Sequence, residues 1–370
     1  KPRVELETFA GFLAIPFSLF FPGISALILQ AGNLGLQVAL HVTAFSSSLS
    51  FSTIWLPDPP STLLFGYYII LIVFALWGYR SRQRTVVCVS LLLLCVLFSV
   101  KSSTMKPLWQ QPTDFRVSYL DIGQGSSTLV EFPSGLQVLI DGGGGTFGST
   151  AIGKRVIAPF LWQKGIDQLD AIVITHPDAD HYNGLDFILE HFSPGSLWIR
   201  GWRGHDDNFR NILYLAEKKR IPVIVPERRH KLGTETDFVT CLENTFIMSE
   251  HSGSTAMAGI RSNSGLILKA CSGNFCTLFP GDIEKEDERI LVAMHNDLGA
   301  SVLLAPHHGS ATSGTPEFLA AVSPQYLIVS ARKSSAGLFP HARVRDECAK
   351  QQITLLTTAQ QGTIELKVTR

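Results

Sequence analysis

The first hundred residues contain long runs without a single Asp, Glu, Lys or Arg. The uncharged runs are Thr8–Pro57, Pro59–Tyr79 and Thr85–Val100. A helix needs about 20 mostly apolar residues to cross a bilayer core of about 30 Å. Membrane spans are therefore predicted near residues 9–30, 62–79 and 84–101. A buried core helix or a signal peptide would explain one such run, but three in succession favour a membrane segment over residues 1–113.

The stretch Ala31–Phe51 differs from its neighbours because it carries polar side chains among Leu and Val. Asn33, Gln37 and His41 are the largest of these. We interpret this stretch as an amphipathic helix that lies in the membrane interface rather than crossing the bilayer. The chain does not begin with Met, and we expect it to be the later part of a longer membrane protein.

Positive charge in the short loops predicts the orientation, because such loops stay on the cytoplasmic side. Arg80, Arg82 and Arg84 lie between the last two spans, and Lys1 and Arg3 precede the first. Both loops place everything after Val100 outside the cytoplasm. Lys101 and Lys106 weaken this bias without reversing it.

The remaining residues, 114–370, have the pattern of a mixed α/β domain. Short β-rich runs are broken by Gly, Pro and Asp, and amphipathic helical runs lie between them. The predicted strands include Phe115–Asp121, Gln137–Ile140, Ala171–Thr175, Leu197–Arg200, Asn244–Ser249, Phe275–Phe279, Ser301–Ala305 and Tyr326–Ser330. Two sheets with helices outside account for this order.

The charge of this domain is close to balanced. Of the 31 Lys and Arg and the 31 Asp and Glu in the chain, residues 1–113 hold 7 and 3, which leaves 24 and 28 for residues 114–370. This excess of acid argues against a basic nucleic-acid-binding domain as a whole. One segment, Arg200–Lys231, is rich in Arg and Lys, including Arg203, Arg228 and Arg229. It is either a surface that holds a polyanion or a solvated helix face and loop. Trp198 and Trp202 flank Arg200 and would stack bases or lie in the core.

The six cysteines show no spacing typical of a metal site. Cys271 and Cys276 bracket a turn-like sequence between two alternating apolar runs, so they are expected to face each other across a hairpin. In an oxidising compartment such a pair can form a disulfide.

The most informative stretch is Ala171-Ile-Val-Ile-Thr-His-Pro-Asp-Ala-Asp-His-Tyr-Asn-Gly184, where a buried strand runs straight into potential metal ligands. These ligands are His176, Asp178, Asp180 and His181. Four such groups within six residues would repel one another or stay unsatisfied in a core, and a divalent cation removes that problem by binding them. The alternative is a solvated polar loop.

Three later segments also place Asp or His after a predicted strand. They are Phe279-Pro-Gly-Asp282, Ala305-Pro-His-His-Gly-Ser310 and Phe339-Pro-His341. Each is weak by itself, since a lone His341 is more often a surface histidine. Together they predict a metal site along one sheet edge.

These motifs resemble the metallo-β-lactamase superfamily, whose signature is H-x-H-x-D-H, then a His, a bridging Asp and a final His. More closely, the chain resembles the C-terminal part of the ComEC-type DNA-internalization (competence) family. The segments that carry this resemblance are Tyr119-Leu-Asp-Ile-Gly-Gln-Gly125, Leu139-Ile-Asp-Gly-Gly143, His176–His181, Asn263-Ser-Gly-Leu-Ile267, Phe279–Asp282 and Pro306–Ser310. The resemblance implies an αββα sandwich over 114–370, preceded by transmembrane helices. It also implies a multi-pass protein of the bacterial inner membrane, with the hydrolase domain on the periplasmic side.

Three positions depart from the patterns of these families. Asp178 replaces the second His of the superfamily signature, and Asn263 stands where a His is expected before the bridging Asp. Ser126 replaces the usual acid after L-D-x-G-Q-G. With two imidazoles lost, the site is richer in oxygen, which favours Mn²⁺ or Mg²⁺, with Zn²⁺ as the alternative.

The resemblance implies two divalent metal ions that activate water and clamp the oxygens of a displacement at phosphorus. We assign His176 and Asp178 to one metal, Asp180, His181 and His308 to the other, and Asp282 to the bridge. His307 and His341 are alternatives for the last ligand that the sequence does not order. Asp141 is expected to orient a ligand His from outside the ligand set.

A small-residue turn follows the first strand of the domain. It consists of Asp121, Gly123, Gln124, Gly125 and Ser126, followed by Ser127. Its backbone N–H groups would approach a phosphate, or the segment is simply a tight hairpin. Phosphate contacts are also expected from Arg200, Arg203, Arg228 and Arg229.

The resulting hypothesis is a nuclease that cleaves single-stranded DNA during uptake across the inner membrane, working with other competence DNA-uptake proteins. Two alternatives stay open. One is a small-ester or lactone hydrolase of the same fold, and the other is a degenerate domain that binds DNA without cleaving it.

Overall fold

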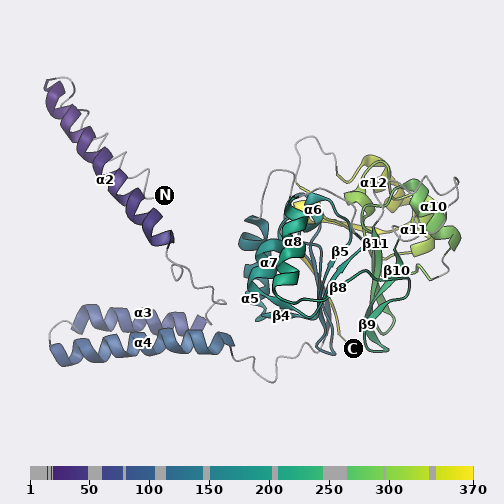
Figure 1. The fold of residues 1–370 in the computed structure, drawn as a ribbon, viewed down its shortest axis with the longest axis horizontal. Helices are drawn as coiled ribbons and strands as arrows, with labels where there is room; N and C mark the ends of the chain where they lie inside the picture. The colour runs from purple at the N-terminus through teal and green to yellow at the C-terminus, as the bar shows by residue number, and fades with distance from the viewer. Residues whose placement is uncertain are drawn as a thin grey trace. The chain divides into compact units, whose positions relative to one another are not determined.

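The computed structural model describes residues 15, 18, 20–48, 61–77, 81–104, 114–144, 151–201, 207–244, 265–294, 297–332 and 339–369. The chain divides into two compact units, Lys1–Leu56 and Pro57–Arg370. Figure 1 shows helices in the first hundred residues and a layered α/β domain after them.

Helix α2 (Pro22–Ser48) corrects the predicted boundary between a span at 9–30 and an interfacial helix at 31–51. One continuous helix crosses that boundary. Its polar residues Asn33, Gln37 and His41 are four apart, so they share one helix face and do not interrupt the backbone. The stretch Pro22–Ser46, 25 residues long, is the one helix in the described part of the chain that is long and apolar enough to cross a membrane.

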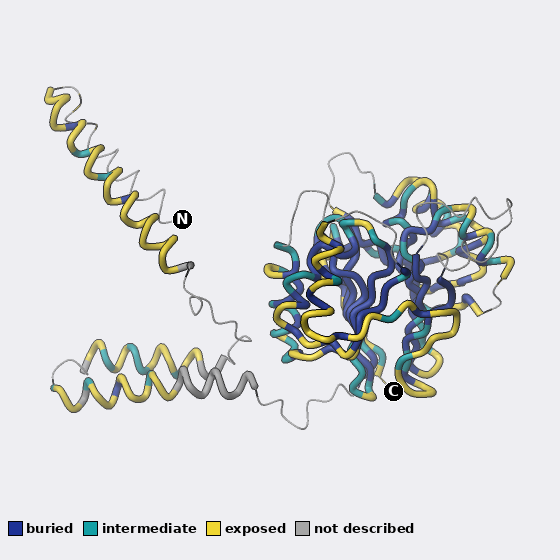
Figure 2. Tube along the Cα trace, in the orientation of Figure 1, coloured by how far each residue is buried: buried dark blue, intermediate teal, exposed yellow. Residues whose placement is uncertain are grey.

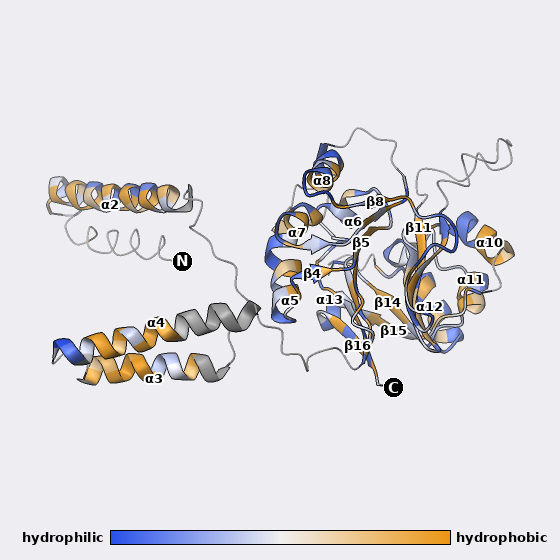
Figure 3. Cartoon of the chain, turned by 60° about the horizontal axis from the view of Figure 1, so that its bottom comes forward, coloured by the Kyte–Doolittle hydropathy of each residue, from blue (hydrophilic) through white to orange (hydrophobic). Residues whose placement is uncertain are grey.

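Helices α3 (Ser61–Trp77) and α4 (Arg82–Thr104) lie side by side as a hairpin. Their apolar stretches among the described residues, Leu64–Leu76 and Thr85–Leu94, are shorter than a full span. Large apolar side chains such as Phe65, Ile72 and Leu93 are exposed on both helices (Figures 2 and 3). Among the described residues, one helix therefore has the required length, and it lies over residues 22–46 rather than over the predicted span 9–30.

The domain after residue 114 contains two seven-stranded sheets among its described residues. The first sheet has the order β16 (Ile364–Val368), β1 (Phe115–Tyr119), β2 (Thr128–Glu131), β3 (Gln137–Ile140), β5 (Ala171–Ile174), β7 (Leu197–Ile199) and β8 (Val223–Ile224). The second has the order β15 (Thr354–Thr357), β14 (Tyr326–Val329), β13 (Val302–Leu304), β12 (Phe275–Phe279), β11 (Leu266–Ser272), β10 (Asp237–Asn244) and β9 (Lys231–Gly233). A short pair, β4 (Gln168–Leu169) and β6 (Ser193–Pro194), completes the strands.

Helices cover the outer face of each sheet. Against the first sheet pack the π-helical turn η2 (Gly153–Ile157), α5 (Ala158–Gln163), α7 (Leu185–His191) and α8 (Asp207–Lys218). Against the second pack α10 (Lys285–Met294), α11 (Pro316–Val322) and α12 (Ala342–Lys350). The short helices α6 (Ala179–Tyr182), η3 (Pro306–Gly309) and α13 (Thr358–Gln361) follow strand ends.

The alternation of side chains along the strands explains this layering. In β3, Val138 and Ile140 join the core between the two sheets, whereas Leu139 joins the core under the helices. In β11, Leu268 lies between the sheets and Ile267 faces the helices. Because successive side chains point to opposite faces of a sheet, strands that are apolar at every position must be covered on both sides. The predicted αββα sandwich is thereby confirmed.

Cys271 and Cys276 are directly opposite each other in the β11–β12 pair. They form a disulfide, as the alternating pattern around the turn predicts. In the same sheet, β10 ends at Asn244, where the sequence predicts a strand Asn244–Ser249 to begin. Residues 245–249 lie outside the described residues.

Candidate metal centre

The candidate site lies where strands of both sheets end. β3 and β5 are parallel neighbours in the first sheet, and β12 and β13 are parallel neighbours in the second. The carboxyl ends of parallel strands meet at one sheet edge, which is where sites form in α/β folds. Asp141 follows β3, the segment Thr175–His181 follows β5, Asp282 follows β12 and His308 follows β13.

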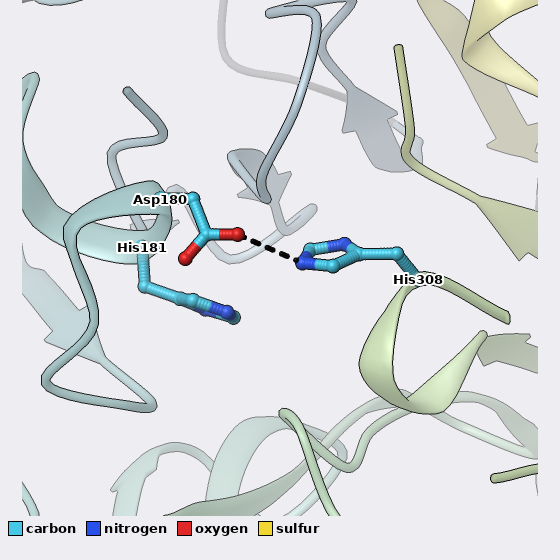
Figure 4. Close-up of side chains that lie close together, drawn as sticks. All are labelled: Asp180, His181 and His308. Carbon is cyan, nitrogen blue, oxygen red and sulfur yellow. Dashed lines mark ion pairs between the residues drawn. The ribbon is translucent and has the colours of Figure 1, made fainter. Parts of the chain in front are cut away.

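Asp180, His181 and His308 form the group that could hold a metal ion (Figure 4). Their ligand atoms all lie within 4.8 Å of one another. His308 Nε2 is 3.3 Å from Asp180 Oδ2, and His181 Nε2 is 3.1 Å from Asp282 Oδ1. His308 Nε2 is also 3.8 Å from Asp282 Oδ2. Two imidazoles and two carboxylates from three separate segments therefore converge.

Both imidazoles of this group are held so that Nε2 faces the centre. His181 Nδ1 lies 2.9 Å from Asp141 Oδ2, and His308 Nδ1 lies 3.0 Å from the Ser330 carbonyl oxygen. These acceptors favour the proton on Nδ1 and leave the Nε2 lone pair for a cation. The buried Nε2 atoms of His181 and His308 lie near carboxylate oxygens, but neither makes a well-aligned hydrogen bond to a described residue.

Asp141 is itself fixed by the strand next to it. It is buried, and its carboxylate accepts bonds of 2.7 Å from both the backbone N–H and the hydroxyl of Thr175. Its backbone is left-handed, with φ 60°, a conformation that Asp and Asn tolerate better than most residues. The contact with His181 matches the orienting position expected from the sequence.

His176 and Asp178, assigned from the sequence to the other metal, lie beside this group. His176 is buried, and its ring centroid is 5.7 Å from that of His181. Its Nε2 is 3.2 Å from Asp178 Oδ2. That contact is not a well-aligned hydrogen bond, and Nδ1 of His176 has no hydrogen-bond partner among the described residues. Asn263, the remaining residue expected here, lies outside them.

The electrostatics of the site favour charged carboxylates. Burial would raise the pKa of Asp282, but the neighbouring His181 and His308 outweigh it and hold the pKa well below its ordinary range. Burial likewise opposes ionisation of Asp180, whose pKa is nevertheless lowered by the same two histidines. Burial would also lower the pKa of His181, but Asp282 and Asp141 raise it well above 6.5. The group therefore presents anionic oxygens to a cation.

The three histidines that the sequence left open occupy different places. His308 is buried within the ligand group. His307 lies at the rim, with Nδ1 3.4 Å from Glu284 Oε1. His341 is exposed and caps helix α12, where it accepts a hydrogen bond from the Arg343 N–H. His307 and His308 both have a left-handed backbone conformation. The His308 ring is buried, whereas the His307 ring lies at the rim.

The turn from Asp121 to Ser126 packs onto the ligand segment. The Ser126 N–H donates to the Asp180 carbonyl oxygen at 3.1 Å, and the Gly123 N–H donates to Asp121 Oδ1 at 3.4 Å. A side chain at Gly125 would place Cβ 2.1 Å from the Asp180 oxygen. Two of the N–H groups expected to meet a phosphate are thus already bonded within the protein, and Gln124 lies between them.

The basic segment contributes Arg200 next to the site. Arg200 follows β7, the parallel neighbour of β5. Burial lowers its pKa, whereas the nearby charge of Asp178 raises it. Arg228 Nε is 3.8 Å from Glu243 Oε2, and Arg229 is exposed. Arg203 and Trp202 lie outside the described residues.

Trp198 does not stack bases, because it is fully buried in the core between the sheets. Its ring contacts His230, with centroids 4.8 Å apart. Ser330 is a residue of the site that the sequence analysis did not single out. Its carbonyl accepts from His308, and its hydroxyl donates to the Gly125 carbonyl oxygen at 2.8 Å. Ser330 is the last residue of the predicted strand Tyr326–Ser330, and this position is the sequence feature that could have indicated a place in the site.

Comparison with known proteins gives two matches to family models. The metallo-beta-lactamase superfamily matches residues 120–331, and a competence protein family matches residues 2–81. The first match covers more than half of the chain.

Curated relatives match both parts of the chain together. ComE operon protein 3 of Bacillus subtilis (strain 168) is 28% identical over 378 residues, which covers 97% of this chain and 45% of the relative. Competence protein ComA of Neisseria gonorrhoeae is 26% identical, with 77% of this chain and 38% of the relative covered. The chain thus spans less than half the length of these relatives. Among solved structures, the metallo-beta-lactamase fold protein YhfI from Bacillus subtilis is 13% identical, with a TM-score of 0.42 and 68% and 99% of the two chains covered.

Proposed function

Because the chain belongs to the metallo-β-lactamase superfamily, we propose that its domain from residue 114 onward is a metal-dependent hydrolase. Its proposed substrate is DNA, above all single-stranded DNA, and the reaction is hydrolysis of the phosphodiester bond. We further propose that this cleavage accompanies DNA uptake across a bacterial inner membrane, in company with other competence proteins.

The observation that supports a metal centre is the convergence of two buried imidazole nitrogens, His181 Nε2 and His308 Nε2, on the carboxylates of Asp282 and Asp180. Neither nitrogen makes a well-aligned hydrogen bond to a described residue, and a cation among these four groups would bind both nitrogens. Asp180 and Asp282 supply the negative charge that such a cation requires. We assign a second cation to His176 and Asp178, with Asp282 as the bridge between the two.

Divalent cations held there would activate the attacking water and neutralise charge on the phosphate oxygens. The share of carboxylate oxygen among these ligands favours Mn²⁺ or Mg²⁺, with Zn²⁺ as the alternative. The chain's own part is to hold the imidazoles in one orientation through Asp141 and the Ser330 carbonyl. This fixed geometry lowers the reorganisation needed when the reaction takes place.

The case for DNA rests on the rim of the site and on the relatives. Arg200 lies near Asp178, and Arg228 and Arg229 follow β8, the parallel neighbour of β7, so these basic residues come after strands that end at the same sheet edge. Guanidinium groups suit phosphate because they donate two parallel hydrogen bonds. One curated relative is named a competence protein, and the family model that matches residues 2–81 is also that of a competence protein.

The membrane part of the proposal concerns residues 1–113. Large apolar side chains are exposed along α2, α3 and α4, and contiguous exposed apolar surface marks a membrane or protein interface. We propose that these helices lie in the inner membrane as part of a multi-pass assembly. Arg80, Arg82 and Arg84 would remain cytoplasmic, and the hydrolase domain would then face the periplasm. The Cys271–Cys276 disulfide agrees with an oxidising compartment.

The test is a substrate panel with the full chain purified in detergent. Single-stranded DNA, double-stranded DNA and a generic ester would each be incubated with Mn²⁺, Mg²⁺ or Zn²⁺, and with a chelator as the control. We expect cleavage of single-stranded DNA that the chelator abolishes. Hydrolysis of the ester alone would favour the small-ester alternative. DNA binding without any hydrolysis would favour a non-catalytic domain.

A further inference from the structure

Ser126 carries a buried hydroxyl that no described residue satisfies. The residue is only 3% exposed, and its Oγ has no hydrogen-bond partner among the described residues. A buried hydroxyl left in this state costs about 1–3 kcal/mol. Such an exception in a native fold calls for a specific cause, such as a bound ion.

The surroundings of this hydroxyl indicate what that cause is. Ser126 lines the same pocket as His181, Asp282 and His308. Two of these residues, His181 and His308, contribute buried Nε2 atoms that face carboxylates without a well-aligned hydrogen bond to a described residue. Unsatisfied donors and acceptors from separate segments therefore surround one small space, and a single cation there would satisfy them together.

The backbone of Ser126 is fixed from both sides, so its position relative to the ligands is set. Its N–H donates to the Asp180 oxygen, and its carbonyl accepts from the Gly143 N–H at 2.8 Å. Gly125, with φ 111°, allows this close packing. The neighbouring hydroxyl of Ser127 is engaged elsewhere, since it donates to the Asp141 carbonyl oxygen at 3.2 Å.

We propose that Ser126 Oγ is an additional ligand of the divalent cation held by His181, His308 and Asp282. This inference deepens the proposed function and depends on a cation binding at that place. A hydroxyl oxygen is a hard, neutral donor that suits Mn²⁺ and Mg²⁺. It binds the cation without adding negative charge, so more of the cation's positive charge remains available to a phosphate.

A thiol placed at position 126 tests this directly. The full chain in detergent would be prepared as wild type, Ser126→Cys and Ser127→Cys, and each protein would be titrated with Co²⁺. A thiolate that binds Co²⁺ produces a charge-transfer absorption band that oxygen and nitrogen ligands do not. We expect the band in Ser126→Cys, and neither in Ser127→Cys nor in the wild type, which also controls for the native cysteines.

The second arm measures affinity without adding a thiol. Ser126→Ala should weaken Mn²⁺ binding by roughly 10-fold or more, the usual effect of losing a group that supports a metal. Thermal unfolding in the presence of a chelator shows whether the variant is folded. Wild-type affinity in a folded Ser126→Ala, or Co²⁺ binding by Ser126→Cys without the band, would overturn the inference and leave the hydrolase proposal intact. A wild-type protein that binds neither cation would overturn both.

Discussion

Replacing Asp141 by Asn should separate the orientation of His181 from the stability of the fold. Asn is isosteric with Asp and tolerates the left-handed backbone at this position. Its amide oxygen can still accept from the Thr175 N–H, which Asp141 now does at 2.7 Å. What the variant loses is the carboxylate oxygen 2.9 Å from His181 Nδ1.

The consequence for metal binding follows from the tautomer of His181. An amide NH₂ that faces Nδ1 is a donor, so it favours the imidazole with its proton on Nε2. That proton occupies the lone pair that a cation needs. Loss of such a partner typically weakens metal binding by about 10–100-fold, which is roughly 1.4–2.7 kcal/mol.

The assay is a competitive Mn²⁺ titration of the full chain, with thermal unfolding in a chelator to compare the metal-free proteins. Asp170→Asn is a matched control, because Asp170 accepts a 2.7 Å bond from the Gln137 N–H at the opposite end of β3. We expect weaker binding for Asp141→Asn and wild-type binding for Asp170→Asn. Equal affinity for Asp141→Asn and wild type would refute the idea that Asp141 orients a metal ligand.

Three further predictions concern the ligand group, the rim and the pH dependence of the metal-free protein. His308→Ala should abolish most DNA cleavage, whereas His307→Ala should have a milder effect; the reverse order in a cleavage assay would show that the wrong member of the pair was assigned. Changing Arg228 and Arg229 together to Ala should weaken single-stranded DNA binding. It should also reduce the slope of log affinity against log salt by about 0.7 for each lost phosphate contact. An unchanged slope would show that neither arginine contacts a phosphate. Without metal, folded His181 keeps a proton that the unfolded chain releases above about 6.5, since its pKa is raised by Asp282 and Asp141 against the effect of burial. Stability measured with denaturant should therefore fall as the pH rises above 6.5, by up to about 1.4 kcal/mol per pH unit, and Mn²⁺ should remove this dependence; a flat profile without metal would contradict the raised pKa.

The sequence predicts the sandwich because its central strands are apolar at every position. Ala171–Ile174 is recognised in this way, and Phe275–Phe279 is apolar except at Thr277. Strand β10 was missed because the buried Asp237 and Glu243 lie within it. Asp237 accepts a 2.7 Å bond from the Ser272 hydroxyl, and Glu243 pairs with Arg228. These partners are distant in sequence, so no local pattern shows that the two acids are satisfied.

The candidate site was predictable where ligands follow a strand at once, as at His176–His181. It was not predictable where the choice depends on a turn. His307 and His308 are adjacent in sequence, and both have a left-handed backbone conformation. In this turn the His308 ring is buried and the His307 ring lies at the rim. The boundary of α2 was misplaced for a related reason. Single polar residues in an apolar helix look like an interruption until their spacing of four is seen to place them on one face.

In the proposed hydrolase, Asp282 holds the cations of a DNA-cleaving centre. The most direct measurement is the rate of single-stranded DNA cleavage by the full chain and by Asp282→Asn, with Mn²⁺ present and the fold of both proteins verified by thermal unfolding. Asp282 is buried with its carboxylate between His181 and His308, and a neutral amide cannot balance the charge of the bound cations. We predict metal-dependent cleavage by the wild type and none by a folded Asp282→Asn. Cleavage by that variant at the wild-type rate would show that Asp282 does not hold a cation needed for the reaction.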